Sequence, residues 1–362
     1  MSANARRLRT MFAVALIVST LSACDNVSWG GADVAVVPPP AKSTGGVELS
    51  TEEEAAMDEL PTGPVLYYVA RSTGGAVMIP VAEITGDSLR SLRTTGDARV
   101  YATRFVAANM RQGQEFALFS RGARVGTYVV QSAQVPEQVS CPIQPQALGS
   151  LELSSGADSI REFLAVAKTQ APLITKRGDE LTTATNTMRN VVGPILAERA
   201  LRARGAQLPG NWQGALEQIT PFPASGRPAP GFAATFLVGD TLGMGMDDLG
   251  YSLFMIAIPT ASQTGYDTTF VDFRDYPKTG KQAPRLVDYL DWTRDDQVEM
   301  LLQVFGTADS WFEVVARSNT GQWRTVLHGR CEGATRSTPV QPSQDSAAAR
   351  DSGVVSGSRP GG

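Results

Sequence analysis

The chain has very few of the side chains on which most catalytic and metal sites depend. Of its 362 residues, one is histidine, His328, and three are cysteine. A metal site with two histidines cannot form within one chain, and a Ser–His–Asp triad would depend on His328. The sequence also has no Gly-x-Ser-x-Gly elbow, no phosphate-binding glycine loop and no dinucleotide fingerprint after a strand. Carboxylate chemistry needs no histidine and stays open, because 36 residues are acidic.

A positive charge excess is also missing. The formal net charge is −4, and an acidic chain has no electrostatic footprint for nucleic acid. Beyond the first two dozen residues, no apolar run is long enough to cross a membrane as a helix. At this length, with 42% hydrophobic residues, the chain can form roughly two ordinary domains.

The N-terminus has the pattern of an export signal. Three arginines, Arg6, Arg7 and Arg9, precede an apolar run over residues 11–21 that is too short for a membrane span. The run ends in the tetrapeptide Leu21-Ser22-Ala23-Cys24, which resembles the lipobox of bacterial lipoproteins. This resemblance implies cleavage before Cys24, lipidation of that cysteine, and a cell-envelope location facing the periplasm or the exterior.

Two alternatives to lipidation remain. A plain secretory signal could end near Ala23, or Arg6 and Arg7 could belong to a twin-arginine export signal. Cleavage in this region removes the three arginines, so the formal charge would change from −4 to −7.

The two other cysteines, Cys141 and Cys331, form an even pair if Cys24 carries lipid. Exported proteins meet an oxidising compartment, so we predict a disulfide between them. In the loop-entropy account, closing a loop of this length contributes about 5 kcal/mol. The alternative is two buried free thiols.

Composition divides the chain into successive regions. We predict a signal peptide over 1–23, a flexible tether over 24–62, and a disordered tail over 333–362. Between them we predict a β region over 63–150, a helical segment with a linker over 151–225, and a C-terminal β unit over 226–332. The predicted class is α+β and mostly β, with antiparallel sheets, covering helices at about 156–204, and two blade-like hairpin units at the C-terminus.

Short β-branched and aromatic runs between turn residues predict the strands. In the first β region they are 65–70, 76–84, 99–107, 115–120 and 125–132. In the C-terminal unit they are 232–238, 251–259, 268–273, 285–290, 298–305, 311–317 and 322–327. The aromatic residues of the later strands are expected in the core, and a contact surface for carbohydrate or protein is the alternative. These residues are Tyr289, Trp292, Phe305, Trp311, Phe312 and Trp323.

Helical spacing of apolar residues occurs in two places. Ile160, Phe163, Leu164 and Ala167 follow the i, i+3, i+4, i+7 pattern and predict one helix. A second helical stretch starts near residue 179 and restarts at Pro194, because proline is tolerated in the first turn of a helix. It ends near 204, and Glu198 and Arg202 form a surface pair on it. Residues 208–231, rich in proline and glycine, are expected to form a linker or an irregular covering loop.

One loop pattern occurs twice, in residues 238–249 and 290–301. In each, a strand ends at an acidic residue, and another acidic residue opens the next strand eight positions later. The pattern resembles the FG-GAP or VCBS repeat of integrin-like β-propellers, and intact copies of that repeat bind calcium. The resemblance covers at most residues 226–332.

The later copy keeps the oxygen-bearing side chains of that repeat at Asp291, Thr293, Asp295 and Glu299. These residues are the candidate calcium ligands, because calcium prefers several oxygen atoms converging on one point. Asp296 stands where the repeat has glycine, which strains the turn.

The earlier copy has the acids Asp240 and Asp248 and keeps the turn glycines Gly243 and Gly245. However, it places Leu242 and Met244 where carboxylates are needed, and alkyl and thioether groups do not suit calcium. Hairpin turns whose acids cap backbone amides are the alternative interpretation of both copies.

These observations favour a non-enzymatic, membrane-anchored envelope lipoprotein with a binding or scaffolding role. Its partner could be an envelope protein or a glycan, and nucleic acid is not expected. A carboxylate-based envelope hydrolase is the first alternative, and a calcium-stabilised adhesion-type module is the second. His328 is expected at the end of a strand, partly exposed, without a catalytic role.

Overall fold

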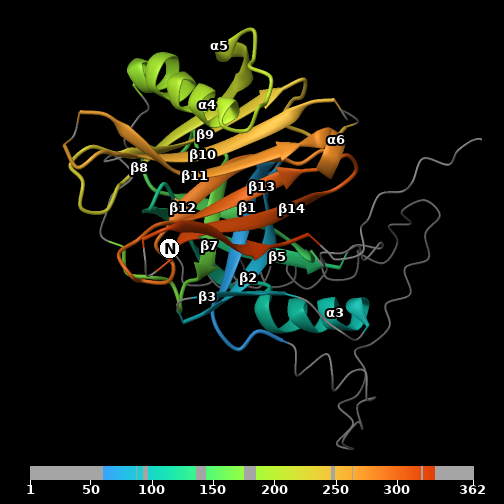
Figure 1. Ribbon diagram of the computed structural model, residues 1–362. Helices are drawn as coiled ribbons and strands as arrows, with labels where there is room; N and C mark the ends of the chain where they lie inside the picture. The colour runs from blue at the N-terminus through green and yellow to red at the C-terminus, as the bar shows by residue number, and fades with distance from the viewer. Residues whose placement is uncertain are drawn as a thin grey trace, which may run out of the picture. The chain divides into compact units, whose positions relative to one another are not determined.

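The computed structural model (Figure 1) describes residues 60–330, except 87, 93–96, 136–143, 175–184, 246–248, 263 and 319–320. The signal, most of the tether and the tail predicted at 333–362 lie outside this range. So do Cys24, Cys141 and Cys331, and the lipidation and disulfide predictions therefore stay predictions. In the described part of the chain, no helix is long and apolar enough to span a membrane.

The fold is mostly β with antiparallel sheets and a few helices, as predicted. The first sheet closes on itself, because β1 pairs with both β7 and β2 and the ring runs β1-β7-β4-β5-β6-β2. We call this ring the closed sheet; β3 is attached to it beside β2. Its elements are β1 (Val65–Ser72), β2 (Gly75–Thr85), β3 (Ser88–Ser91), β4 (Glu115–Ser120), β5 (Ala123–Gln134), β6 (Gln146–Leu153) and β7 (Glu162–Ala167).

The closed sheet has an apolar interior that is sealed by helix α3 (Ala98–Asn109). Successive side chains of a strand point to opposite faces, so in β1 Tyr67 and Val69 pack inside while Leu66 and Tyr68 pack on the outer face. Helix α3 contributes Tyr101, Ala102 and Phe105 to the interior, among other residues. All of these side chains are nearly or fully buried.

Two four-stranded antiparallel sheets follow, each in simple chain order. The seven strands predicted after residue 231 are all present, and they lie in two antiparallel sheets, one of which also includes β8 from the region predicted as linker. The first of these two four-stranded sheets contains β8 (Leu216–Phe222), β9 (Gly231–Val238), β10 (Tyr251–Pro259) and β11 (Tyr266–Asp275). The second contains β12 (Ala283–Leu290), β13 (Glu299–Phe305), β14 (Ser310–Arg317) and β15 (Trp323–His328).

The sheets are layered through two shared apolar clusters. The β12–β15 sheet packs one face on the outside of the closed sheet, where Leu301 and Val314 meet Ala117 and Leu164. Its other face packs on the β8–β11 sheet. Helix α4 (Gly193–Arg202), preceded by the π-helical turn η3 (Met188–Val192), covers the remaining face of the β8–β11 sheet. Figure 1 shows this succession from α4 through the sheets to α3.

Five of the six late aromatic residues are buried, as predicted, and lie in or beside these layers: Tyr289, Trp292, Trp311, Phe312 and Trp323. Phe305 is half-buried, and the Arg285 guanidinium lies 5.8 Å from the centre of its ring.

The second predicted helix is confirmed in its described part. Pro194 lies in the first turn of α4, which ends at Arg202. Glu198 and Arg202 form the expected i,i+4 ion pair, with a nitrogen–oxygen distance of 2.7 Å.

The strand predicted at 99–107 is wrong, because this segment is helix α3. The Asp97 carboxylate accepts the backbone N–H groups of Arg99 (2.7 Å) and Val100 (3.0 Å) and so caps the helix. The apolar side chains then gather on one face over the end of the closed sheet.

The helix predicted from Ile160 to Ala167 is also wrong, because residues 162–167 form β7. This strand is buried on both faces: Phe163 and Ala165 point into the closed sheet, and Leu164 and Val166 point out. A short continuous apolar run of this kind fits helical spacing by coincidence.

The linker predicted at 208–231 is only partly correct. It contains the short helix α5 (Trp212–Ala215) and strand β8. Pro221 lies within β8, and a proline is tolerated there because β8 is an edge strand of its sheet. Strands β3 and β6 were not predicted at all. A further short helix, α6 (Tyr276–Thr279), follows β11.

Candidate functional site

The acidic loop between β12 and β13, defined here as residues 291–299, brings the predicted cation ligands together. Leu290 pairs directly with Glu299 across the hairpin, so the start and end of the loop are adjacent. One carboxylate oxygen from each of Asp291, Asp295 and Glu299 lies within 4.8 Å of the other two. This triad could hold a metal ion, and Asp295 is exposed whereas Glu299 is buried.

Hydrogen bonds within the acidic loop fix these carboxylates. Asp291 accepts the backbone N–H groups of Arg294 (2.6 Å), Asp295 (3.1 Å) and Asp296 (3.1 Å). Arg294 and Asp296 have positive φ values of 67° and 61°, so the turn does adopt the conformation for which the sequence lacks a glycine.

Glu299 accepts a hydrogen bond from the Trp292 backbone N–H (3.0 Å) and another from the Thr293 hydroxyl. Thr293 is therefore bound to Glu299. Burial raises the pKa of Glu299 to about 7 against the effect of these bonds, and the carboxylates of Asp291 and Asp295 raise it further. The pKa of Asp291 is also raised, first by burial. Negative charge is thus concentrated in a partly dehydrated loop.

The earlier copy of the motif has a different electrostatic arrangement. Asp240 forms an ion pair with Lys281, and only 2% and 3% of their side chains are exposed. The Tyr276 hydroxyl donates a second hydrogen bond to Asp240 at 2.8 Å. In this loop the positive charge beside Asp240 therefore comes from the Lys281 ammonium group, where an intact repeat would place a calcium ion. Asp248 lies outside the described residues.

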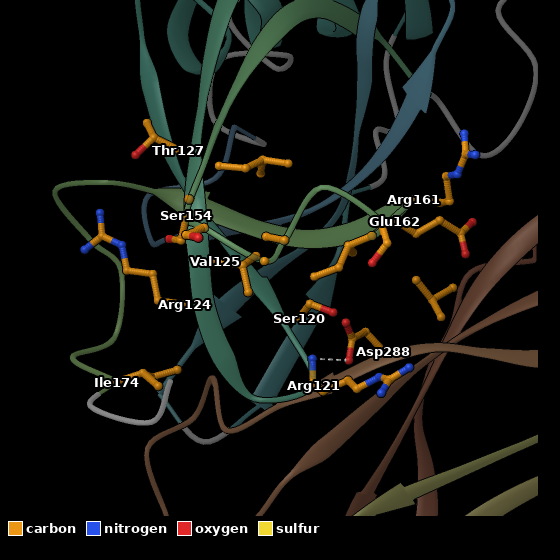
Figure 2. Close-up of a pocket in the computed structure, with 18 of the residues that line it drawn as sticks. Ser120, Arg121, Arg124, Val125, Thr127, Ser154, Arg161, Glu162, Ile174 and Asp288 are labelled. Atoms are coloured by element: carbon orange, nitrogen blue, oxygen red, sulfur yellow. Dashed lines mark hydrogen bonds between the residues drawn. The ribbon is translucent and has the colours of Figure 1, made fainter. Parts of the chain in front are cut away.

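A cleft of about 1270 Å³ lies where the closed sheet meets β8 and β12 (Figure 2). The closed sheet contributes the β4–β5 turn, part of β5 and the segment between β6 and β7. The opposite wall contains Gln218 and Thr220 of β8 with Val287 and Asp288 of β12. The side-chain amide of Gln218 joins these two strands, because it donates to the Leu286 carbonyl (2.8 Å) and accepts from the Leu286 N–H (2.9 Å).

Asp288 is the buried carboxyl group of this cleft. It follows a bulge in β12 after Leu286 and accepts the backbone N–H groups of Arg121 (2.7 Å) and Tyr289 (2.8 Å). The Ser120 hydroxyl also forms a hydrogen bond with it. Burial raises the pKa of Asp288 to about 7 in spite of these bonds. The carboxyl group therefore fastens the β4–β5 turn to β12, and Figure 2 shows it beside Arg121 and Ser120.

Glu162, on the same cleft, is held by a different set of donors. Both guanidinium Nη atoms of Arg285 bind its carboxylate, one at 2.6 Å, and the Tyr68 hydroxyl donates to it as well. Burial alone would raise the pKa of Glu162, but the hydrogen bonds from Arg285 and Tyr68 outweigh burial and lower it. Glu162 is therefore an ionised carboxylate paired with a fixed arginine.

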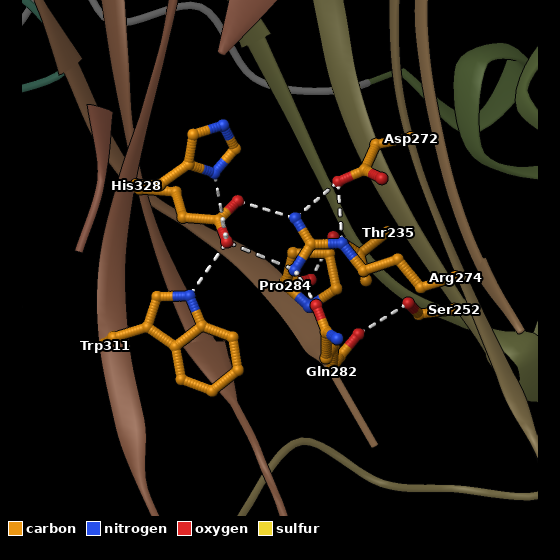
Figure 3. Close-up of polar contacts among 9 residues, drawn as sticks. Thr235, Ser252, Asp272, Arg274, Gln282, Pro284, Trp311 and His328 are labelled. Atoms are coloured by element: carbon orange, nitrogen blue, oxygen red, sulfur yellow. Dashed lines mark hydrogen bonds and ion pairs between the residues drawn. The ribbon is translucent and has the colours of Figure 1, made fainter. Parts of the chain in front are cut away.

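A third polar group links the two four-stranded sheets (Figure 3). Arg274 of β11 binds Asp272 (2.6 Å) and, from the other sheet, Glu313 of β14 (2.5 Å). The Trp311 indole N–H donates to Glu313 at 2.8 Å. His328 ends β15 with 68% of its side chain exposed, and its Nδ1 lies 4.0 Å from Glu313. The position of His328 agrees with its prediction, and the network ties one sheet to the other.

The chain has no match among protein families, curated proteins or solved structures. Functional inference therefore depends on the residues themselves. Sequence reasoning found the acidic loop, but it missed Asp288, Glu162 and Arg285. The Arg121-Gly122 turn was the available signal for the cleft, and nothing in its sequence indicated that it contacts β12.

Proposed function

We propose that this protein is a membrane-anchored envelope lipoprotein that binds a polar ligand in the cleft between the closed sheet and strands β8 and β12, without a reaction. The observation that carries the binding role is the cleft itself, which is large enough for an extended ligand. The anchoring role is supported by the lipobox-like Leu21-Ser22-Ala23-Cys24 segment alone.

Binding is favoured over hydrolysis by the state of the two carboxyl groups. A glycosidase-type pair needs one acid that gives up a proton and one carboxylate free to attack or to activate water. Glu162 is instead bound by Arg285 and Tyr68, and Asp288 is bound by two backbone amides and a hydroxyl. These donors support a structural role for both groups.

A cleft-blocking substitution tests the binding role. Thr127 lines the cleft on β5, and Thr127→Trp would fill part of it; Thr268→Trp, on the edge strand β11, is the matched control outside the cleft. In native mass spectrometry of the full-length chain purified from envelope membranes, we expect a bound species of constant mass in the wild type and the control. Its loss in Thr127→Trp supports the proposal. A wild type without any bound species contradicts it.

The anchor has its own test. Radioactive palmitate should label the wild-type chain in growing bacteria and fail to label Cys24→Ala. Equal labelling of both, or of neither, rejects lipidation at Cys24. Peptide mapping without reducing agent would show a Cys141–Cys331 crosslinked peptide if the predicted disulfide exists, and two separately alkylated cysteines if it does not.

A carboxylate-based hydrolase is the second candidate, and one observation favours it. Asp288 has a pKa of about 7 while Glu162 in the same cleft is ionised, and such a difference is typical of acid/base pairs. Hydrolysis of an envelope glycan that falls about 100-fold or more in Asp288→Asn, with ligand binding retained, would support this candidate.

A calcium-stabilised module is the third candidate, and the acidic triad favours it. Three carboxylates within 4.8 Å offer the hard oxygen ligands that calcium takes. This function does not exclude binding in the cleft, since the acidic loop and the cleft are different parts of the structure.

A further inference from the structure

Arginine side chains gather around the cleft although the chain as a whole is acidic. Arg121, Arg124 and Arg161 line it, in a protein with a formal charge of −4. Among the described residues, none of the three takes part in a salt bridge, and all three are exposed. Figure 2 shows Arg124 and Arg161 at opposite sides of the cleft, with Arg121 at its foot. Three acids also line the cleft: Glu162 is paired with Arg285, Asp288 is buried beside Arg121, and Glu152 is exposed. Arginines that outnumber the exposed acids around a cleft attract anions.

A second hollow extends this charge beyond the cleft. It has a volume of about 610 Å³, and its wall includes Arg71 and Arg161 together with the hydroxyl residues Ser72, Thr73 and Ser150. Arg161 lines both hollows, and the Arg71 backbone N–H donates to the Arg161 carbonyl at 2.9 Å, so the two arginines are adjacent. We call the cleft and this hollow together the groove.

The guanidinium of Arg71 has one hydrogen-bond donor that is not satisfied within the described structure. Its Nε atom is buried and has no hydrogen-bond acceptor among the described residues. A buried donor without an acceptor is costly, by roughly 1–3 kcal/mol, and a guanidinium is suited to a carboxylate or phosphate. An anionic group in this hollow would satisfy Arg71.

Arg121 stands at a position that the backbone does not favour for arginine. Its φ is 50° and that of Gly122 is 72°, a hairpin turn in which asparagine, aspartate or glycine is usual. The turn is secured through its backbone, since Arg121 N–H binds Asp288 and Gly122 N–H binds the Tyr289 carbonyl at 3.0 Å. The guanidinium contributes to neither of these bonds. Strain of this kind at a cleft indicates a functional side chain.

The remaining lining residues indicate which kind of anion fits. The groove is lined by many hydroxyl side chains, and no aromatic side chain is among the described lining residues. Unpaired nucleic acid is typically bound by aromatic stacking. A chain of sugars presents hydroxyls along its length, and these can pair with serine and threonine.

Resting on the proposed binding function, we propose that the groove binds an acidic glycan, whose carboxylate or phosphate groups are bound by Arg71, Arg161, Arg124 and Arg121. Arg161 would contact the glycan between the two hollows. Arg121 would bind it at the foot of the cleft.

Titration calorimetry on the full-length chain in detergent tests this proposal. The probes are oligogalacturonate for carboxylate, poly(glycerol phosphate) for phosphate, neutral maltohexaose, and a single-stranded oligonucleotide. We expect saturable binding of at least one acidic glycan, at least tenfold weaker binding of maltohexaose, and weakening by added salt because exposed charges are screened. Which acidic probe binds more tightly identifies the charged group.

Two charge-reversal variants distinguish a specific contribution of the groove from an effect of the overall charge of the protein. Arg161→Glu should weaken binding of the acidic glycan at least tenfold. Arg324→Glu makes the same charge change on an exposed arginine of β15 outside the groove and should leave binding within twofold. Equal losses in the two variants would mean a general charge effect and overturn the proposal.

Arg121→Gly tests the strained turn without removing its backbone N–H. Glycine favours positive φ, so the variant should melt at the same temperature as the wild type or higher, while binding the acidic glycan several-fold more weakly. Unchanged binding would remove Arg121 from the site.

The outcomes distinguish the ligand class from the binding function. Stronger binding of maltohexaose than of either acidic probe, lost in Thr127→Trp, would retain the cleft as a binding site and reject the acidic class. Preferential binding of the oligonucleotide would reject the glycan. If no probe binds and native mass spectrometry finds no bound species in the wild type, the binding function itself fails.

Discussion

The two copies of the repeated loop begin from the same spacing of acids and reach different electrostatic states. In the earlier copy, Asp240 is buried against Lys281, so its charge is neutralised inside the protein. In the later copy, Asp291, Asp295 and Glu299 lie together, and the donors that bind them are backbone amides, the Thr293 hydroxyl and the side-chain amide of Gln297, none of which carries a charge. The difference is made by residues outside the motif. A lysine 41 positions away from Asp240 contacts one loop, and the other loop keeps its negative charge for water or a cation.

The largest effect should come from removing the lysine of the earlier loop. Lys281→Met leaves the Asp240 carboxylate buried without its counter-ion, which should lower the free energy of unfolding by roughly 3–5 kcal/mol. Urea denaturation measures this loss. Lys278→Met is the matched control, because Lys278 pairs with Asp275 with 79% of its side chain exposed, and such surface pairs contribute only about 0.2–1 kcal/mol. A loss below about 1 kcal/mol in Lys281→Met would show that the buried pair is not important to stability.

The second effect concerns pH and the later loop. The folded pKa of Glu299 is raised to about 7 from the ordinary value of 4.5, so between these values the unfolded chain binds fewer protons than the folded one. Stability should therefore decrease as pH rises from 4.5 to 7, by about 2 kcal/mol for this group. Asp288, whose pKa is also about 7, adds a similar decrease.

Glu299→Gln should remove only the share of that slope due to Glu299, and should be more stable than the wild type at pH 8. Denaturant midpoints at pH 5, 6, 7 and 8 measure it. An unchanged slope in the variant would mean that Glu299 is ionised in the folded protein throughout this range.

A third and smaller effect is expected from calcium. If the acidic loop binds the ion, a concentration ten times the dissociation constant stabilises the folded state by about 1.4 kcal/mol, which is a few degrees in melting temperature. The shift should vanish in the Asp291→Asn and Asp295→Asn double variant and persist in Asp240→Asn. No shift in the wild type at millimolar calcium would leave the later loop as a solvated hairpin turn.

The smallest effect is expected at the strained turn of the later loop. Asp296→Gly places glycine at φ 61° and relieves left-handed strain, while glycine also adds entropy to the unfolded chain. The two terms nearly cancel, so stability should change by less than about 0.5 kcal/mol. A gain well above 1 kcal/mol would show that the missing glycine had been a serious strain.

Sequence patterns predicted the part of the fold in which local and tertiary preferences agree. The C-terminal strands alternate or are bounded by turn residues, and Pro194 starts α4 as expected. The predictions at 99–107 and at 160–167 were wrong for a common reason. The apolar residues of both segments fit helical and strand spacing alike, and each set is buried against a neighbouring layer: those of α3 over the end of the closed sheet, and those of β7 on both faces of that sheet.

Of the two candidate sites, one could be predicted from the sequence and the other could not. The acidic loop could be predicted because its ligands lie within nine residues of one hairpin. The groove could not be predicted, since Arg121 and Asp288 are 167 residues apart in the chain and Glu162 and Arg285 are 123 apart. The spacing of residues along a sequence carries no information about contacts of that range.

By itself, the sequence determined which chemistry is unavailable and where most strands begin and end. One histidine excludes two-histidine metal sites within the chain, and periodicity sets the faces of strands and helices because it follows from backbone geometry. Tertiary structure alone decided which acids are neutralised, which stay charged, and where arginines surround a groove. The reason is that charge is governed by burial and by partners from distant elements, and those are set only when the sheets have packed together.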